Sequence, residues 1–210
     1  MESHHRAMSS GQFDHHSQNK SANQLDQKLV TRVQKGDRTA FDLLLVKYQN
    51  RVASIVSRFV DTPEDIADVT QEVFIRAYRA IHSFRGDSAF YTWLFRIAIN
   101  YAKIFLQKNK TRKVYQEKEY SEGQVKDQSK LFNLESPENI LSRPELAEGI
   151  ENALAVMPAE LSVALILREF DALSYEEISK VMDCPIDSVR SRIFRARELL
   201  DNTIKSFSGC

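Results

Sequence analysis

The chain has 210 residues, which is enough for one ordinary domain or two small ones. Apolar residues make up 42% of it and charged residues 28%, the formal net charge is zero, and no apolar run is long enough to cross a membrane, so direct membrane insertion is excluded. The N-terminus lacks the apolar segment of an export signal, and we therefore expect a cytoplasmic protein.

The chain contains only six glycines and five prolines, with little alternation of β-branched residues, which predicts an all-α fold. The two cysteines, Cys184 and Cys210, form no CxxC pair, so neither a disulfide framework nor a zinc site is expected. Residues 1–24 are polar and patternless, and we interpret them as a disordered tail. The histidines of this tail lack neighbouring ligands at helical spacing, and no metal or other cofactor is expected.

From residue 25 to about residue 107, apolar residues recur with a helical period and predict a compact bundle of four helices. Gly36 is well placed to end the first helix. The third helix has a clear start signal, with Thr62 as N-cap and Pro63 at the first helical position. This helix turns one apolar face inward. Its other face presents Asp65, Asp68, Gln71 and Glu72.

The segment from Asp61 to Glu72 carries five acidic residues and no basic one. Such a face suits a basic protein partner. A metal-dependent nuclease that uses Glu64, Asp68 and Glu72 is an alternative, although no histidine or second acidic cluster accompanies these carboxylates. We therefore favour an exposed docking face.

The fourth helix belongs to the stretch SFRGDSAFYTWLFRIAINYAK, residues 83–103, and has an apolar face and a separate polar face. Its apolar residues form one stripe, and a second stripe gathers Trp93, Arg96, Asn100 and Lys103. Aromatic faces stack on unpaired bases for roughly 1–3 kcal/mol each, asparagine bonds base edges, and cations neutralise phosphate. Phe84 and Arg85, just before the helix, are predicted to wall a base pocket. The competing interpretation is that Trp93 is partly core and the cations are merely solvated.

The charge around this helix favours nucleic acid. Six basic residues and no acidic one lie between Tyr91 and Lys113, in a chain of zero net charge. Residues 108–135 are polar and lose helical periodicity, and we expect a flexible linker there.

A second small domain is predicted over residues 136–206. Ser174 and Glu177 form a capping box at the start of a short helix, which Pro185 and its neighbours end before a longer helix begins near Asp187. This is a helix-turn-helix pattern, whose second helix enters a major groove. The residues expected to contact duplex DNA are Arg190, Ser191, Arg192, Phe194, Arg195 and Arg197.

The two most specific stretches of the chain are DVTQEVFIRAYRAIHSFRGDSAFYTWLFRIAIN and LSYEEISKVMDCPIDSVRSRIFRARE. Both closely resemble bacterial RNA polymerase sigma factors of the extracytoplasmic-function (ECF) group, most closely the sigma-E envelope-stress type. The resemblance spans residues 25–204. It implies a non-catalytic specificity subunit that directs core RNA polymerase to specific, envelope-stress promoters. The linker and the tail match no pattern of that family.

In terms of residues, the resemblance implies that the first domain captures the melted minus-ten element through the Phe84 to Lys103 region. The helix-turn-helix would read the minus-thirty-five element. The acidic helix face would dock on the largest polymerase subunit, and the second domain on the other large subunit. A membrane-anchored anti-sigma factor is an expected further partner.

A stand-alone helix-turn-helix regulator is the alternative from another class. In that case the first bundle is a sensor or dimerisation module, and only the second domain contacts DNA. Substitutions of Trp93 and Asn100 distinguish the two hypotheses, because they should abolish promoter opening only in a sigma factor.

Overall fold

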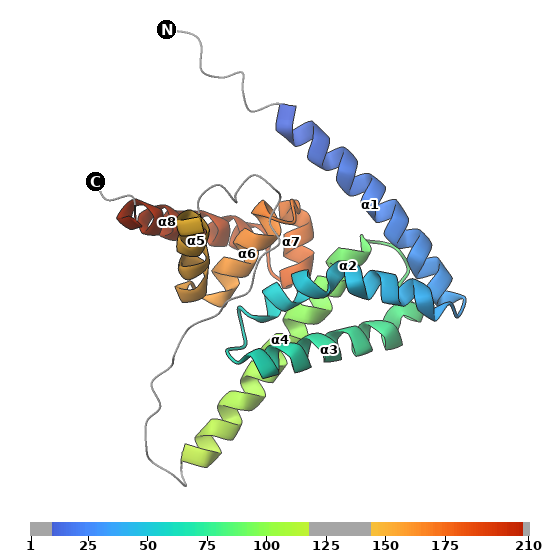
Figure 1. Ribbon diagram of the computed structural model, residues 1–210, viewed down its shortest axis with the longest axis horizontal. Coiled ribbons are helices and arrows are strands. Elements are labelled where there is room, and N and C mark those ends of the chain that lie inside the picture. The colour runs from blue at the N-terminus through green and yellow to red at the C-terminus, as the bar shows by residue number, and fades with distance from the viewer. Residues whose placement is uncertain (1–9, 118–143, 208–210) are drawn as a thin grey trace.

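A computed structural model describes the backbone of residues 10–117 and 144–207, and the side chains of residues 22–109 and 149–203 (Figure 1). The regular elements of these ranges are helices, with no strand, which confirms the all-α prediction. No helix within the described ranges is long and apolar enough to span a membrane. Most of the predicted linker and the first residues of the predicted second domain, from residue 136, lie outside the described residues.

The first half of the chain forms a bundle in which local capping signals mark the starts of α2 and α3. Asp37 caps α2 by accepting a hydrogen bond from the Ala40 amide, and Thr62 caps α3 by accepting one from the Asp65 amide. Gly36 follows α1 with a φ of +96°, which favours glycine. The elements are α1 (Ser10–Gln34), α2 (Arg38–Val56), α3 (Pro63–Ala80), the 3₁₀ helix η1 (Ile81–Ser83) and α4 (Phe90–Glu117).

Two helices extend beyond their predicted limits. α1 begins at Ser10, within the segment interpreted as a disordered tail, and residues 1–9 lie outside the described residues. Neither glycine nor proline occurs from Gln12 to Lys35, so nothing interrupts a helix that is anchored at its C-terminal half. That anchor is Asp26, which is fully buried and accepts hydrogen bonds from Lys47 and Tyr48 of α2. α4 likewise continues to Glu117, past the predicted domain end at residue 107.

The second half contains the predicted helix-turn-helix. The capping box is present, since the Ser174 hydroxyl accepts from the Glu177 amide and the Glu177 carboxylate accepts from the Ser174 amide. Asp183 ends the short helix in the left-handed conformation, at a φ of +52°. The elements are α5 (Pro144–Val156), α6 (Ala159–Glu169), α7 (Tyr175–Met182) and α8 (Ile186–Phe207).

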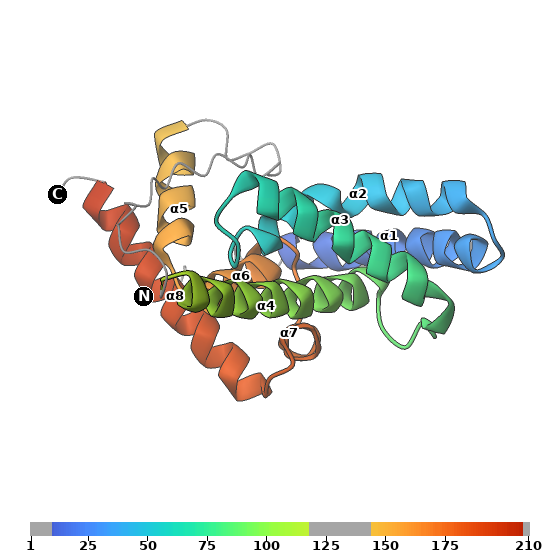
Figure 2. The same ribbon diagram turned by 90° about the horizontal axis from the view of Figure 1, so that it is seen from below.

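The two helical regions pack against each other. α7 packs against α4, with α6 and α8 as further neighbours of α7 (Figure 2). One apolar cluster joins side chains of both regions, among them Phe95 of α4, Leu167 of α6 and Ile178 of α7, all 0% exposed. The predicted DNA-binding elements of the two regions are therefore neighbours in this structure.

Candidate nucleic-acid and polymerase interfaces

The polar stripe of α4 is largely accessible. Arg96 and Asn100 are exposed, whereas Trp93 and Lys103 are half-buried. Their spacing of three, four and three residues places all four on one side of the helix. The opposite side is core, with Leu94, Ala98 and other apolar side chains 0% exposed. α4 thus offers an aromatic, an amide and two cations in a row, as its sequence predicts.

Trp93 belongs to an aromatic cluster rather than standing alone. Its ring centroid lies 5.1 Å from that of Phe84 and 5.7 Å from that of Phe90. Phe84 is only 7% exposed and Phe90 is buried completely. One side of the indole is therefore packed, as the core interpretation expects, and the rest is accessible. Phe84 supports the indole from the core and exposes little surface of its own.

The loop that carries Phe84 and the exposed Arg85 is tied to α1. The side-chain nitrogen Nε2 of Gln34 donates to the carbonyl oxygens of Ile81 and Phe84, at 2.9 Å each. Gly86 has a φ of +81°, and a Cβ atom there would lie 2.7 Å from Nε2 of Gln27. Neither glutamine could be identified from the sequence, because no local pattern marks a contact between segments so far apart in the chain.

The helix-turn-helix exposes most of the residues predicted to contact duplex DNA. Arg190, Ser191, Phe194, Arg195 and Arg197 of α8 are exposed, and Arg192 is half-buried. Phe194 is 63% exposed, which is unusual for an aromatic side chain in a packed helical domain. On the inner side of α8, Val189, Ile193 and Ala196 are buried. The helix is therefore fixed by its apolar face while its arginine-rich face stays accessible.

Three of the four arginines on α8 already have acidic partners. Arg190 pairs with Asp187 one turn earlier, at 3.2 Å. Arg197 pairs with Glu169 of α6 at 2.5 Å, and this hydrogen bond raises the pKa of the Arg197 guanidinium. Arg192 binds Glu160 of α6 at 2.5 Å and also contacts the Cys184 sulfur.

The acidic face of α3 lies where the sequence predicts it. Asp68 and Gln71 are exposed, and Asp65 and Glu72 are half-buried. Glu72 forms an ion pair with Arg76, 2.8 Å away on the same helix. The described residues contain no group of three His, Cys, Asp or Glu side chains that could hold a metal ion, so Glu64, Asp68 and Glu72 do not form one.

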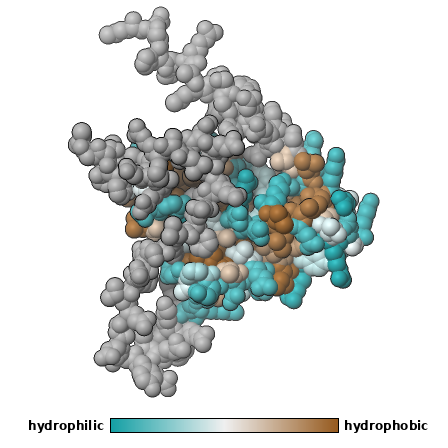
Figure 3. All heavy atoms as spheres, viewed as in Figure 1, coloured by the Kyte–Doolittle hydropathy of each residue, from teal (hydrophilic) through white to brown (hydrophobic). Residues whose placement is uncertain are grey.

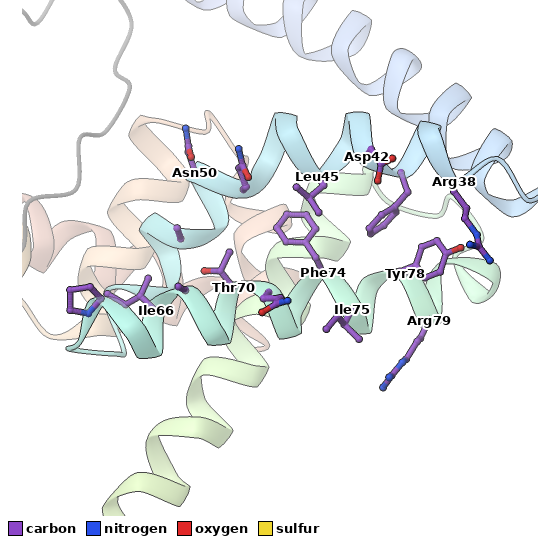
Figure 4. Close-up of a pocket in the computed structure, with 16 residues that line it drawn as sticks. Arg38, Asp42, Leu45, Asn50, Ile66, Thr70, Phe74, Ile75, Tyr78 and Arg79 are labelled. Carbon is purple, nitrogen blue, oxygen red and sulfur yellow. The ribbon is translucent and has the colours of Figure 1, made fainter.

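An apolar groove lies beside this acidic face, between α2 and α3, with a volume of about 910 Å³. Leu45 of α2 and Phe74 of α3 point toward one another across it, and Tyr78 and Arg38 lie at one end (Figure 4). Gln71 also lines it. Apolar side chains are visible among polar ones on this side of the molecule (Figure 3). The groove was not apparent from the sequence, because it depends on the spacing of two helices.

Known protein families match both helical regions of the chain. Residues 44–112 match the family described as sigma-70 region 2, and residues 147–200 match the family described as sigma-70, region 4. The chain is 50% identical over 181 residues to the ECF RNA polymerase sigma-E factor of Escherichia coli strain K12, covering 86% of this chain and 94% of that protein. It is 48% identical over 185 residues to the RNA polymerase sigma-H factor of Pseudomonas aeruginosa, with the same coverage.

Among solved structures, CnrH in complex with the cytosolic domain of CnrY matches with a TM-score of 0.59 at 21% identity, covering 87% of this chain and 98% of that one. At this identity the likeness concerns the fold. The family matches and the near relatives, which extend over most of the chain, establish more. The chain belongs to the extracytoplasmic-function sigma factors of bacterial RNA polymerase.

Proposed function

We propose that this chain binds core RNA polymerase, directs it to specific, envelope-stress promoters and captures the melted non-template strand, without catalytic groups of its own. The observation that carries the proposal is the presence of two separate basic faces, on α4 and α8, in a chain of zero net charge. A third, acidic face on α3 suits a protein partner. Membership of the sigma factors does not favour a stand-alone regulator.

The melted strand would bind along α4. Stacking of an extruded base on the accessible part of Trp93 offsets the cost of unstacking it, which is a few kcal/mol. Asn100 can bond the base edge, while Arg85, Arg96 and Lys103 neutralise nearby phosphates. Phe84 contributes by holding the indole in place, at a ring distance of 5.1 Å.

The duplex element would be read by α8. Arg190 and Arg195 can each form two hydrogen bonds with the edge of a guanine. Ser191 and Phe194 can contact a base edge or a thymine methyl group. Arg192 and Arg197 would contact phosphates at the flanks, after exchanging their acidic partners for DNA. Phosphate contacts fix the register of the helix on the duplex, and the base contacts supply the sequence preference.

The polymerase would dock on Asp65, Asp68, Gln71 and Glu72 through its largest subunit, and the second domain would contact the other large subunit. The apolar groove beside Gln71 supports this assignment, since protein interfaces combine an apolar centre with a polar rim. The proposal includes a cytoplasmic location and a membrane-anchored anti-sigma factor, and family membership supports both.

The test is to reconstitute core RNA polymerase with the chain and to map open-promoter formation by permanganate reactivity. Wild type should open a bubble, Asn100→Ala should bind upstream and fail to melt, and Arg195→Ala should fail to engage the upstream element. If no bubble forms with wild type while the chain alone protects a duplex operator, the proposal is wrong and the protein is a conventional regulator.

A further inference from the structure

The contact between the two helical regions has consequences for DNA binding. We infer that, outside a transcription complex, the chain holds a closed, autoinhibited state in which its helix-turn-helix region docks on α4 and Glu160 occupies one cation of each DNA-binding face. The DNA part of this inference rests on the proposed function. The closed state itself can be tested without DNA or polymerase.

The docking surface on α4 is centred on Tyr91. Its hydroxyl donates to the carboxylate of Glu177 in α7, at 3.2 Å, and its ring lies 6.2 Å from that of Phe95. Phe95 and Ile178 of α7 belong to the apolar cluster that joins the two regions, and both are 0% exposed. Parting α4 from α7 would expose this apolar surface to water, so the contact is favourable as it stands.

Two ion pairs that do not involve Tyr91 also connect the regions. Arg58, which follows α2, lies 3.4 Å from Glu151 of α5, and the Arg58 side chain is only 6% exposed. Arg51 of α2 lies 3.6 Å from Asp171, in the turn before α7. The N-terminal bundle therefore holds α5, the α6–α7 turn and α7 at once, which fixes the orientation of the helix-turn-helix.

Glu160 links the two predicted DNA surfaces directly. One of its carboxylate oxygens lies 3.6 Å from Nζ of Lys103 on α4, and the other lies 2.5 Å from the guanidinium of Arg192 on α8. In the proposed function, each of these cations neutralises a phosphate. A carboxylate held between them takes the place that a phosphate would have on either face. Binding of DNA at Lys103 or Arg192 must therefore displace Glu160.

The closed state also cannot engage both promoter elements. Elements centred about 25 base pairs apart are separated by roughly 85 Å along B-form DNA, at about 3.4 Å per base pair. In the closed state Tyr91 and Glu177 are in hydrogen-bond contact. The helix-turn-helix must consequently leave α4 when the promoter complex forms, and core polymerase, which binds each region separately in the proposed function, supplies the free energy for that step.

The first test measures shape. Tyr91→Glu would place a carboxylate against Glu177 in the closed state, yet it suits the first turn of α4. We expect small-angle X-ray scattering of the full chain to show a larger radius of gyration for Tyr91→Glu than for wild type. Ile104→Glu is the control, because Ile104 is an exposed apolar residue of the same helix. Circular dichroism checks that the variants stay helical, and the double variant Glu160→Gln, Glu177→Gln replaces Tyr91→Glu if that one unfolds.

Equal radii of gyration for wild type and a folded opening variant would overturn the closed state. This result is independent of the proposed function, since it involves neither polymerase nor DNA. Conversely, a closed chain that fails to open promoters with core polymerase would refute the proposed function alone.

The second test measures competition with DNA. Glu160→Gln should raise the affinity of the full chain for a short single-stranded oligonucleotide and for a short duplex by about two- to fivefold, the effect of losing an exposed ion pair. Glu176→Gln is the matched control, because it removes the same charge from an exposed position in α7. Equal gains for the two variants would overturn the role assigned to Glu160.

Discussion

The guanidinium of Arg51 lies 3.6 Å from the carboxylate of Asp171, whose side chain is only 7% exposed. Burial raises the pKa of Asp171 to about 6, and Arg51 opposes that shift only in part. Tyr91 and Glu177 lie close by, and burial together with the Glu177 carboxylate raises the pKa of Tyr91. At the contact between the two helical regions, ionisation of the Asp171 carboxyl group therefore lowers the stability of the folded state.

This cost predicts a pH dependence. Because the folded-state pKa of Asp171 is raised, its contribution to stability is fully present below about pH 4 and is lost as the pH rises through about 6. The loss amounts to about 3 kcal/mol at most. We expect Asp171→Asn to unfold at higher urea concentration than wild type at pH 7.5, and to show a weaker change between pH 4.5 and 7.5. A variant less stable than wild type at pH 7.5 would mean that the Arg51 ion pair outweighs desolvation.

The features that could be predicted from the sequence are local ones. Thr62 with Pro63 and Ser174 with Glu177 mark helix starts within four residues, so the caps of α3 and α7 could be identified without any tertiary information. The faces of α4 and α8 followed from the helical period in the same way. These signals also sufficed to place the residues of both predicted DNA-binding faces.

The features that could not be predicted depend on how helices pack. Gln34 forms hydrogen bonds with the loop after η1, which is far from it in the chain. Glu160 likewise lies between Lys103 and Arg192, which come from two distant helices. The partial burial of Trp93 depends on Phe84, which approaches it from a loop. The early start of α1 leaves no apolar pattern, because that part of the helix is polar. Such features require the three-dimensional arrangement.

Gln34 is expected to matter for promoter melting through the loop that it holds. Gln34→Leu would remove the side-chain donor to the carbonyl groups of Ile81 and Phe84, although the Ile81 carbonyl still accepts from the Phe84 amide. The loss should lower the free energy of unfolding by about 1–3 kcal/mol. We also expect a smaller permanganate signal in the open complex at a temperature where the variant is folded. Gln24→Leu, at an exposed position of α1, is the control and should change neither quantity. A melting signal of wild-type strength for Gln34→Leu would show that the loop keeps its shape without this contact.

Substitutions of Trp93 and Phe84 should distinguish an effect on promoter melting from an effect on folding stability. Phe84→Ala removes a buried ring and should cost about 3–5 kcal/mol of folding stability, measured by urea unfolding. Trp93→Ala should cost less, because the indole is only half-buried, yet it should abolish the open complex. Trp93→Phe, which keeps an aromatic face for stacking, should restore part of the melting. Efficient opening by Trp93→Ala would place the extruded base elsewhere.

Arg195 and Arg197 provide a comparison on the duplex-reading face. Arg197 is paired with Glu169 at 2.5 Å, whereas the exposed Arg195 has no ion pair among the described residues. Arg195→Ala should weaken binding of the sigma–polymerase complex to promoter DNA by about 1–3 kcal/mol and change its base preference, as expected for a base contact. Arg197→Ala should weaken binding less and equally for all sequences, because a phosphate contact carries no sequence information and DNA must first displace Glu169. Filter-binding measurements over a range of salt concentrations distinguish these cases. A uniform loss for Arg195→Ala, with unchanged base preference, would reassign Arg195 to the phosphate backbone.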